Sequence, residues 1–414
     1  MSSDSFLQDD QLHDRFRALD SFLFAHQPLW RPKPFTELYL PWERDYPELA
    51  SWLRGRSLEQ AEHAHNHPER LDAPYPFAQL AQEAVDLSHI GELPAHAIDS
   101  VEPRMSVDVP GRKWQQIEAL AAHLNFRHQP SHWLDWCSGK GHLGRRLAQR
   151  GQALTCLEHD PALVEAGRKL SARLNIQAEH VQQDVMAEDA WRSLHPEQTP
   201  VALHACGDLH VQLMQIASQN GCAQMAIAPC CYNRTRAEHY QALSSAGRES
   251  ALQLSRDELG LPLSETVTAG ARVRRQRDAS MARRLGFDLL QRELRGVDAY
   301  LPTPSLPTAW LDKPYASYCE ELAQLKNIPA PGAQDWAALE DAGWRRLAQV
   351  RNLELVRNLF RRPLEIWLVL DRALYVREHG YHVSVGTFCD TRLTPRNLLV
   401  LAEQPSDIST TTCG

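Results

Sequence analysis

The stretch from Ser131 to Gly151, SHWLDWCSGKGHLGRRLAQRG, has the pattern of a β-strand, a glycine-rich turn and the start of a helix. The strand ends at Asp135, and three glycines follow before an arginine-rich helix. A strand that enters such a loop is the way in which α/β proteins hold a nucleotide-like cofactor. Glycine suits the loop because a side chain would keep the cofactor away from the backbone. The stretch therefore predicts an α/β fold with a cofactor site at this turn.

The spacing of the loop narrows the kind of cofactor. GKGHLG fits the pattern G-x-G-x-x-G, but a dinucleotide site requires a strand that runs directly into the first glycine. Here three residues separate Asp135 from Gly139, which disfavours a nicotinamide-dependent oxidoreductase. The form D-x-C-x-G-x-G-x-x-G instead resembles motif I of class I S-adenosylmethionine methyltransferases. The resemblance implies that Asp135 holds the methionine end of the cofactor and that the loop passes under its sulfonium and ribose.

The next elements of the chain agree with this resemblance. QALTCLE is a short apolar strand that ends in Glu158, and Asp160-Pro161 is a good start for a helix. The resemblance implies that Glu158 accepts the ribose hydroxyls and that Asp184 accepts the adenine amino group. The predicted fold is a Rossmann-like, seven-strand class I sheet. The candidate cofactor-binding residues are Asp135, Cys137, Gly139, Gly141, Glu158, Asp184, Val185 and Cys206.

Three further motifs narrow the family. HACGD ends the predicted fourth strand at Asp208, PCCY ends the fifth at Tyr232, and TPRNLLVLAEQ covers residues 394–404. Together they resemble the methyltransferase-like protein 25 group, which includes the methyltransferase domain of the glutathione S-transferase C-terminal-domain-containing protein. A more distant similarity is to the eukaryotic ribose methyltransferase of the tRNA acceptor stem. The resemblance covers about residues 100–405.

Composition limits the class of protein. The chain has 414 residues, of which 43% are apolar, but no run long enough to span a membrane. The N-terminal stretch is acidic and polar, so we expect no secretory signal. Nine scattered cysteines favour a reduced cytoplasmic protein over a disulfide framework. The net charge of −8 argues against general affinity for nucleic acid.

The pattern of elements predicts three regions. Residues 1–110 have helical periodicity with proline-rich breaks, and we expect a helical N-terminal region there. Residues 111–232 and 363–405 supply the Rossmann-like domain. Residues 233–362 form an insertion after the fifth strand, which must carry its own helices because so long a loop is implausible in a compact domain. We expect helices at 238–247, 280–296 and 335–360.

Asp208 and Tyr232 are the candidate catalytic residues, since each follows a strand at the predicted acceptor edge. Methyl transfer chiefly needs alignment, and a carboxylate can hold or deprotonate an acceptor N–H or O–H. Asp208 can equally cap the helix that follows it. Tyr232 can stack on a planar acceptor, as the aromatic residue of the Asn-Pro-Pro-Tyr motif does in amino-methyltransferases, although that motif follows the fourth strand and PCCY follows the fifth. Alternatively, Tyr232 can pack in the core with its hydroxyl bonded to the backbone.

The Cys230-Cys231 pair admits several interpretations. Adjacent cysteines point to opposite sides of an extended strand, and the chain has no C-x-x-C partner, so we expect no metal site. A covalent cysteine mechanism would suit methylation of a pyrimidine carbon. Small residues packed near the cofactor are the favoured interpretation. His63, His65 and His67 are expected at a polar helix end rather than around a metal.

Arginines crowd into the insertion, at positions 272, 274, 275, 277, 283 and 284. An insertion at that point emerges at the carboxyl edge of the sheet, so a basic patch there, joined by Arg112 and Lys113, would suit a phosphate backbone. A solvated helix face is the alternative. We expect an S-adenosylmethionine-dependent methyltransferase whose acceptor is RNA, such as tRNA or rRNA. A protein side chain as acceptor, or a cofactor-binding RNA-binding or scaffold module without turnover, stays open.

Overall fold

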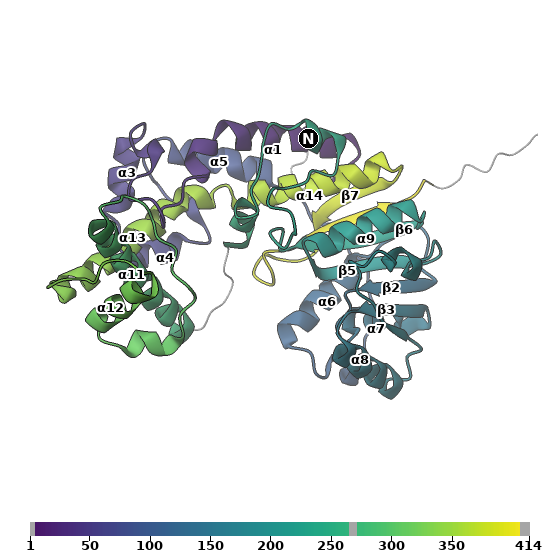
Figure 1. Cartoon of the computed structure of the whole chain (residues 1–414). Coiled ribbons are helices and arrows are strands. Elements are labelled where there is room, and N and C mark those ends of the chain that lie inside the picture. The colour runs from purple at the N-terminus through teal and green to yellow at the C-terminus, as the bar shows by residue number, and fades with distance from the viewer. Residues whose placement is uncertain (1–4, 265–270, 406–414) are drawn as a thin grey trace, which may run out of the picture. The chain divides into compact units, whose positions relative to one another are not determined.

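The computed structural model describes residues 5–264 and 271–405, and the chain divides into two compact units (Figure 1). The first, called here the sheet unit, comprises residues 1–24, 87–262 and 364–414. The second, called the helical unit, comprises residues 25–86 and 263–363. Each unit is thus built from segments that lie far apart in the sequence.

One eight-stranded sheet organises the sheet unit, in the order β1-β7-β8-β6-β5-β2-β3-β4. β2, β3, β4, β5 and β6 are parallel, whereas β8 is antiparallel to both of its neighbours. The strands are β1 (Leu7–Gln8), β2 (His132–Trp136), β3 (Ala153–Glu158), β4 (Glu179–Gln182), β5 (Thr199–Cys206), β6 (Gln224–Cys230), β7 (His382–Thr387) and β8 (Leu398–Glu403).

The predicted Rossmann-like class I fold is confirmed, with one more strand than expected. The extra strand is β1, whose two residues pair antiparallel with Ser384 and Val385 of β7. So short an edge strand has no alternating apolar pattern to mark it, and its pairing depends on β7, which lies more than 370 residues further along the chain. β6 is buried along its whole length, as expected for a parallel strand covered on both faces.

Helices connect and cover the strands of this sheet, and α7, α8 and α9 each contact the strands that they join. The Asp160 side chain accepts a hydrogen bond from the Ala162 N–H (2.8 Å) and so caps α8, as predicted. The helices of the sheet unit are α1 (Asp10–Ala25), η3 (Pro103–Ser106), α6 (Gly111–His123), α7 (His142–Leu147), η4 (Ala148–Arg150), α8 (Pro161–Arg173), η5 (Ala190–Ser193), α9 (Asp208–Gln219), α10 (Ser245–Glu249), η6 (Glu258–Ser264) and α14 (Arg361–Glu378).

The helical unit contains the helices α2 (Gln27–Trp30), η1 (Pro41–Glu43), α3 (Pro47–Arg54), α4 (Leu58–Ala64), η2 (Pro68–Arg70), α5 (Phe77–Ser88), α11 (Ala271–Arg295), η7 (Thr308–Asp312), α12 (Tyr315–Leu325) and α13 (Trp336–Asn358). α1, α5, η6 and α14 cross the limits between the units. α13 packs against α11 and also against α3 and α4. This packing explains why residues 25–86 group with 263–363, so that the units differ from the predicted limits at residues 110, 232 and 362.

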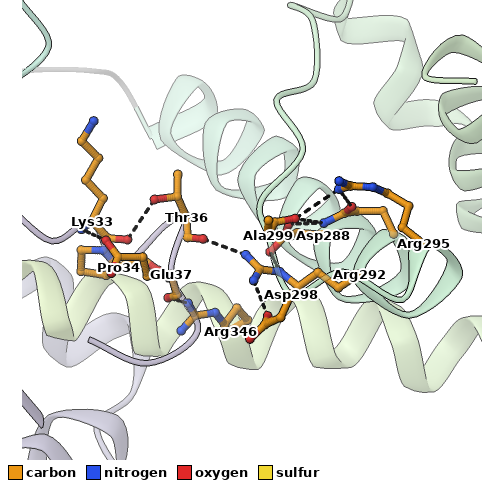
Figure 2. A network of polar contacts seen from close by, with 11 residues as sticks. Lys33, Pro34, Thr36, Glu37, Asp288, Arg292, Arg295, Asp298, Ala299 and Arg346 are labelled. Atoms are coloured by element: carbon orange, nitrogen blue, oxygen red, sulfur yellow. Dashed lines mark hydrogen bonds and ion pairs between the residues drawn. The ribbon is translucent and has the colours of Figure 1, made fainter. Parts of the chain in front are cut away.

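Buried arginines tie the segment 33–37 to the long helices of the helical unit, and Figure 2 shows this network. Arg292 is paired with Asp288 (3.0 Å) and Asp298 (2.6 Å) and donates to the Thr36 carbonyl oxygen (2.7 Å). Arg346 donates to the carbonyl oxygens of Pro34 and Glu37. These contacts satisfy backbone acceptors in a proline-rich segment that has no regular secondary structure of its own.

The predicted helix at residues 238–247 is wrong, whereas α11 and α13 lie where the other two were expected. His239 forms an isolated antiparallel bridge with Ser255, and the segment reaches helix only at α10. Asp371 of α14 holds the segment extended, because its carboxylate accepts from the Tyr240 hydroxyl and from the Leu243 and Ser244 N–H groups. Tertiary hydrogen bonds thus override the local helical pattern.

No helix in the described residues is long and apolar enough to cross a membrane.

Replacing Asp371 by Ala is expected to lower the free energy of unfolding by at least about 3 kcal/mol, because buried hydroxyl and N–H donors lose their acceptor. Asp371→Asn keeps one carbonyl acceptor and should cost less. Urea denaturation followed by tryptophan fluorescence measures the effect. The control is Glu188→Ala, which removes an exposed carboxylate and should change stability by less than about 0.5 kcal/mol. Equal stability of Asp371→Ala and the control would contradict the assigned role.

Candidate active site at the carboxyl edge of the sheet

Most of the predicted site residues gather at one edge of the sheet. Parallel strands end on the same side, and the register places Trp136 beside Leu157, Glu158 beside Gln182, and Cys206 beside Cys230. In open α/β sheets, ligands bind outside the carboxyl ends of the strands. The fold therefore brings the glycine loop and the two motifs HACGD and PCCY to a common edge.

Asp135 fixes the glycine loop through a hydrogen bond to the first turn of α7. Its side chain is 3% exposed, and one carboxylate oxygen accepts the Gly144 N–H (2.8 Å) at the start of α7. Burial raises the pKa of Asp135 to about 6, although the Gly144 hydrogen bond and the charges of Arg145 and Lys113 act in the opposite direction. Burial thus destabilises the ionised form of Asp135, and a cationic ligand beside the carboxylate would offset this destabilisation.

Glu158 is half-buried and holds both the glycine loop and the turn that follows β3. One of its oxygens accepts the Gly139 N–H (2.8 Å), and the other accepts the Asp160 N–H (3.0 Å). A carboxylate has about four acceptor positions, so these contacts leave capacity for hydroxyl groups of a ligand. Asp184, two residues after the end of β4, is exposed and accepts the Met186 N–H (2.9 Å), while Val185 is buried.

The glycine loop is open above Gly139. This residue has a φ of 56°, and a methyl group built on it would meet nothing within 4 Å. Glycine is favoured there by conformation, and the space beside it is available to a ligand that lies on the backbone. Cys137 and Gly141 also have left-handed backbones, and burial raises the pKa of the Cys137 thiol to about 12, so this thiol is protonated at neutral pH.

Asp208 fixes the loop that follows β6. Its carboxylate accepts the Arg236 N–H (2.8 Å), and its own N–H donates to the Arg234 carbonyl oxygen (3.0 Å). Gly207 makes this close approach possible, because a Cβ there would lie 1.9 Å from the same carbonyl oxygen. Gly207, and not Asp208, occupies the N-cap position of α9. Asp208 thus joins the ends of β5 and β6, and its predicted catalytic role stays a prediction.

Tyr232 is 2% exposed, so its ring offers no open face in this conformation. Its hydroxyl makes long contacts with the Pro229 carbonyl oxygen (3.5 Å) and with Glu365 (3.4 Å). The guanidinium of Arg372 lies 5.2 Å from the ring centroid, close enough for a cation–π contact. The predicted stacking on an acceptor would require the ring to be uncovered first and stays a prediction.

Residues far downstream support this tyrosine, and the sequence did not mark them individually. Arg372 of α14 donates to His210 Nε2 (2.7 Å), and His210 Nδ1 contacts the Ala205 carbonyl oxygen (2.8 Å). Burial, together with the charge of Arg372, lowers the pKa of His210 to about 3, so the imidazole is neutral. Glu365 pairs with Arg396 (3.0 Å), which brings the motif TPRN beside PCCY.

Three cysteines gather at the ends of β5 and β6. The sulfur atoms of Cys206, Cys230 and Cys231 all lie within 4.8 Å of one another, and Cys206 and Cys230 are 3.6 Å apart. Thiol hydrogen bonds lower the pKa of Cys231 and raise that of Cys230. All three are free cysteines. Only Cys206 was predicted to bind the cofactor.

The arginines of the insertion differ in their surroundings, and Arg277 is half-buried beside Asp278 (3.8 Å). Arg283 and Arg284 donate to carbonyl oxygens of residues 303–313 and so serve the packing of the helical unit. Arg272, Arg274 and Arg275 are exposed on α11. Arg112 belongs to the sheet unit and donates to the Leu393 carbonyl oxygen (2.9 Å).

A family model supports the assignment of this edge to a methyltransferase domain. Residues 112–238 match a family model described as a methyltransferase domain, and this range contains all the predicted site residues. The chain matches no curated protein. A solved structure of a Listeria monocytogenes protein, proposed to be a class I S-adenosylmethionine-dependent methyltransferase, is 12% identical over 52% of this chain and 72% of that chain. Its TM-score of 0.22 does not by itself establish a common fold.

Folding raises the pKa of Asp135 from 3.8 to about 6. Between these two pH values the carboxyl is therefore protonated in the folded protein but ionised in the unfolded chain. Stability should therefore fall as pH rises between about 4 and 6, by up to about 3 kcal/mol from this group. Asp135→Asn, which keeps an acceptor for Gly144, should remove that fall. Urea denaturation of the wild-type protein and of the variant from pH 4 to pH 7 measures the free energy of unfolding. The same dependence on pH in both proteins would contradict a raised pKa of Asp135.

Proposed function

We propose that this protein, an enzyme with a methyltransferase domain, transfers the methyl group of S-adenosylmethionine to RNA. The observation that carries the cofactor assignment is the row of acids at the ends of neighbouring strands. Asp135 is the penultimate residue of β2, Glu158 is the last residue of β3, and Asp184 follows β4 by two residues, around a glycine loop that is open at Gly139. A class I methyltransferase fold implies use of this cofactor.

The donor set fits the cofactor. S-adenosylmethionine supplies an activated methyl group on a sulfonium, so the chain itself must bind, orient and exclude water. Asp135 would face the cationic methionine end, Glu158 the ribose hydroxyls, and Asp184 the adenine amino group. Cys137, Val185 and Cys206 would contribute to the walls of the pocket. Alignment at the acceptor side would come from Asp208, whose carboxylate joins the ends of β5 and β6.

The exposed arginines of α11 support RNA as the acceptor. Arg272, Arg274 and Arg275 stand out in an acidic chain, and arginine suits phosphate because its planar fork can donate two hydrogen bonds. The proposal reduces the predicted patch to these three, because Arg283 and Arg284 are engaged within their unit and Arg277 is half-buried beside Asp278 (3.8 Å). tRNA and rRNA are the expected kinds of acceptor.

The relation to the methyltransferase-like protein 25 group belongs to the same proposal. It is supported by the motifs HACGD and PCCY, which lie at the ends of the paired strands β5 and β6, and by TPRN, which meets PCCY because Glu365 contacts both Arg396 and Tyr232. A cytoplasmic location is also proposed, from the scattered cysteines of the sequence.

S-adenosylmethionine at about 100 times its dissociation constant should stabilise the folded protein by about 2.7 kcal/mol, whereas NAD should not. Glu158→Ala should weaken the binding of S-adenosylhomocysteine by more than about tenfold, a loss of about 1.4 kcal/mol, because the ribose hydroxyls lose their acceptor. Isothermal calorimetry measures the affinity. The control, Glu165→Ala, removes an exposed acid of α8 and should change nothing. An unchanged affinity of Glu158→Ala for S-adenosylhomocysteine would contradict the placement of the cofactor pocket at this edge of the sheet.

Exchange of Arg272, Arg274 and Arg275 for Glu should weaken RNA binding and lower its salt dependence. For single strands the slope of log affinity against log salt is about −0.7 per neutralised phosphate, so the slope should become shallower by about 2. Fluorescence anisotropy with labelled cellular tRNA at several salt concentrations measures this. Cofactor affinity should be unaffected.

A matched control for that variant exchanges Arg44, Arg70 and Arg345 for Glu, which are also exposed residues of the helical unit. Both triple variants change the net charge equally, so general repulsion of RNA should affect them alike. Equal loss in both would refute a phosphate site on α11. Label from methyl-labelled cofactor that enters the protein fraction of a cell extract, with none in its RNA, would favour a protein side chain as acceptor.

A further inference from the structure

The three cysteines at the ends of β5 and β6 come together through an unusual backbone conformation. Cys206 and Cys230 are paired across the two strands, so their sulfur atoms lie on neighbouring positions of one edge. If the chain remained extended after Cys230, the next side chain would point to the opposite face. Cys231 instead has a φ of 47°, which breaks this alternation and leaves its sulfur within 4.8 Å of the other two.

This triangle has the dimensions of a metal site. Zn²⁺ binds thiolates at about 2.3 Å in tetrahedral geometry, which separates its sulfur ligands by roughly 3.8 Å. The Cys206 and Cys230 sulfurs are 3.6 Å apart, and the remaining pairs are separated by at most 4.8 Å. Small side-chain rotations would therefore close the site. Three thiolates select thiophilic ions such as Zn²⁺ over Mg²⁺ or Ca²⁺.

We propose that Cys206, Cys230 and Cys231 bind one Zn²⁺ ion at the acceptor edge of the sheet. Three protein ligands leave the fourth position open, which is the arrangement of catalytic rather than purely structural zinc sites. Cys206 and Cys231 are half-buried, and their partial exposure provides an entry path, while Cys230 is 4% exposed. The site does not depend on the nature of the acceptor.

The charges around the cluster suit such an ion. Three thiolates and one Zn²⁺ carry a net charge of −1, which needs a positive partner when partly buried. Arg234 and Arg396 supply positive charge that acts on the Cys231 sulfur, from the loop after β6 and from the segment before β8 respectively. The ion would thus connect the two strands whose ends Asp208 already joins.

The test uses the full-length protein, reduced, freed of metal by a chelator and kept under argon. Titration with Co²⁺ should give one equivalent of binding with the visible absorption of tetrahedral coordination and a sulfur-to-metal charge-transfer band. Zn²⁺ should displace the Co²⁺ and remove both signals. Cys206→Ser, Cys230→Ser and Cys231→Ser should each weaken binding by at least about 100-fold, because loss of a ligand costs more than loss of a group that orients one.

The matched control is Cys222→Ser, a buried cysteine just before β6 whose sulfur contacts the His195 carbonyl oxygen (3.5 Å). A serine hydroxyl can replace that contact, and metal binding should be unaltered. A second measurement needs no variant. Zn²⁺ should protect Cys206 and Cys231 of the wild-type protein from iodoacetamide, as mapped by mass spectrometry, but should leave the reaction of the half-buried Cys389 unchanged.

Several outcomes would overturn the proposal. One is the absence of a charge-transfer band in the reduced wild-type protein, and another is unaltered titration in a folded Cys206→Ser variant. Equal rates of alkylation at Cys206 and Cys231 with and without Zn²⁺ would have the same meaning. A Cys206–Cys230 disulfide that forms in air, in a protein that binds no Co²⁺ after reduction, would assign the cluster to redox chemistry instead.

Discussion

The hydrogen bond from the Gly144 N–H to the buried Asp135 carboxylate is the contact on which the candidate site depends. It joins the end of β2 to the start of α7 and thereby sets the path of the glycine loop between them. Glu158 then holds the same loop from β3 through the Gly139 N–H. Two carboxylates on adjacent parallel strands thus define a backbone surface that is open on one side, which is the form that a flat, hydroxyl-bearing cofactor requires.

The side of the edge at the ends of β5 and β6, where we propose that the acceptor binds, depends on residues from the C-terminal part of the chain. Arg372 and Glu365 of α14 surround Tyr232, and Arg396 connects the segment before β8 to the same cluster. Asp371, the neighbour of Arg372, holds the segment after β6 in place. The helix α14 therefore supports both Tyr232 and the loop after β6 to which Asp208 is hydrogen-bonded. The geometry at the ends of β5 and β6 is thus set by contacts between residues more than 100 positions apart in the sequence.

The cysteine cluster illustrates how a sound local rule can fail. Alternation of side chains along a strand predicts that Cys230 and Cys231 point apart, and the sequence offers no C-x-x-C partner. The strand ends at Cys230, however, and the left-handed backbone of Cys231 removes the premise of the rule. The third sulfur comes from Cys206, 24 residues earlier, through the parallel pairing of β5 with β6.

Local sequence patterns were sufficient to predict the class of fold, the order of the strands along the chain and the position of Asp135, Glu158 and Asp184 at one edge of the sheet. Those features depend on local patterns: apolar strands of buried parallel type, glycine turns, and carboxylates at or near the end of a strand. Three features became visible only in the folded chain: β1 joins the sheet, residues 25–86 pack with 263–363, and Tyr232 is enclosed by Arg372 and Glu365. Strand pairing, helix packing and buried ion pairs join residues that are distant in sequence, so a local sequence pattern does not identify the residues that it will contact.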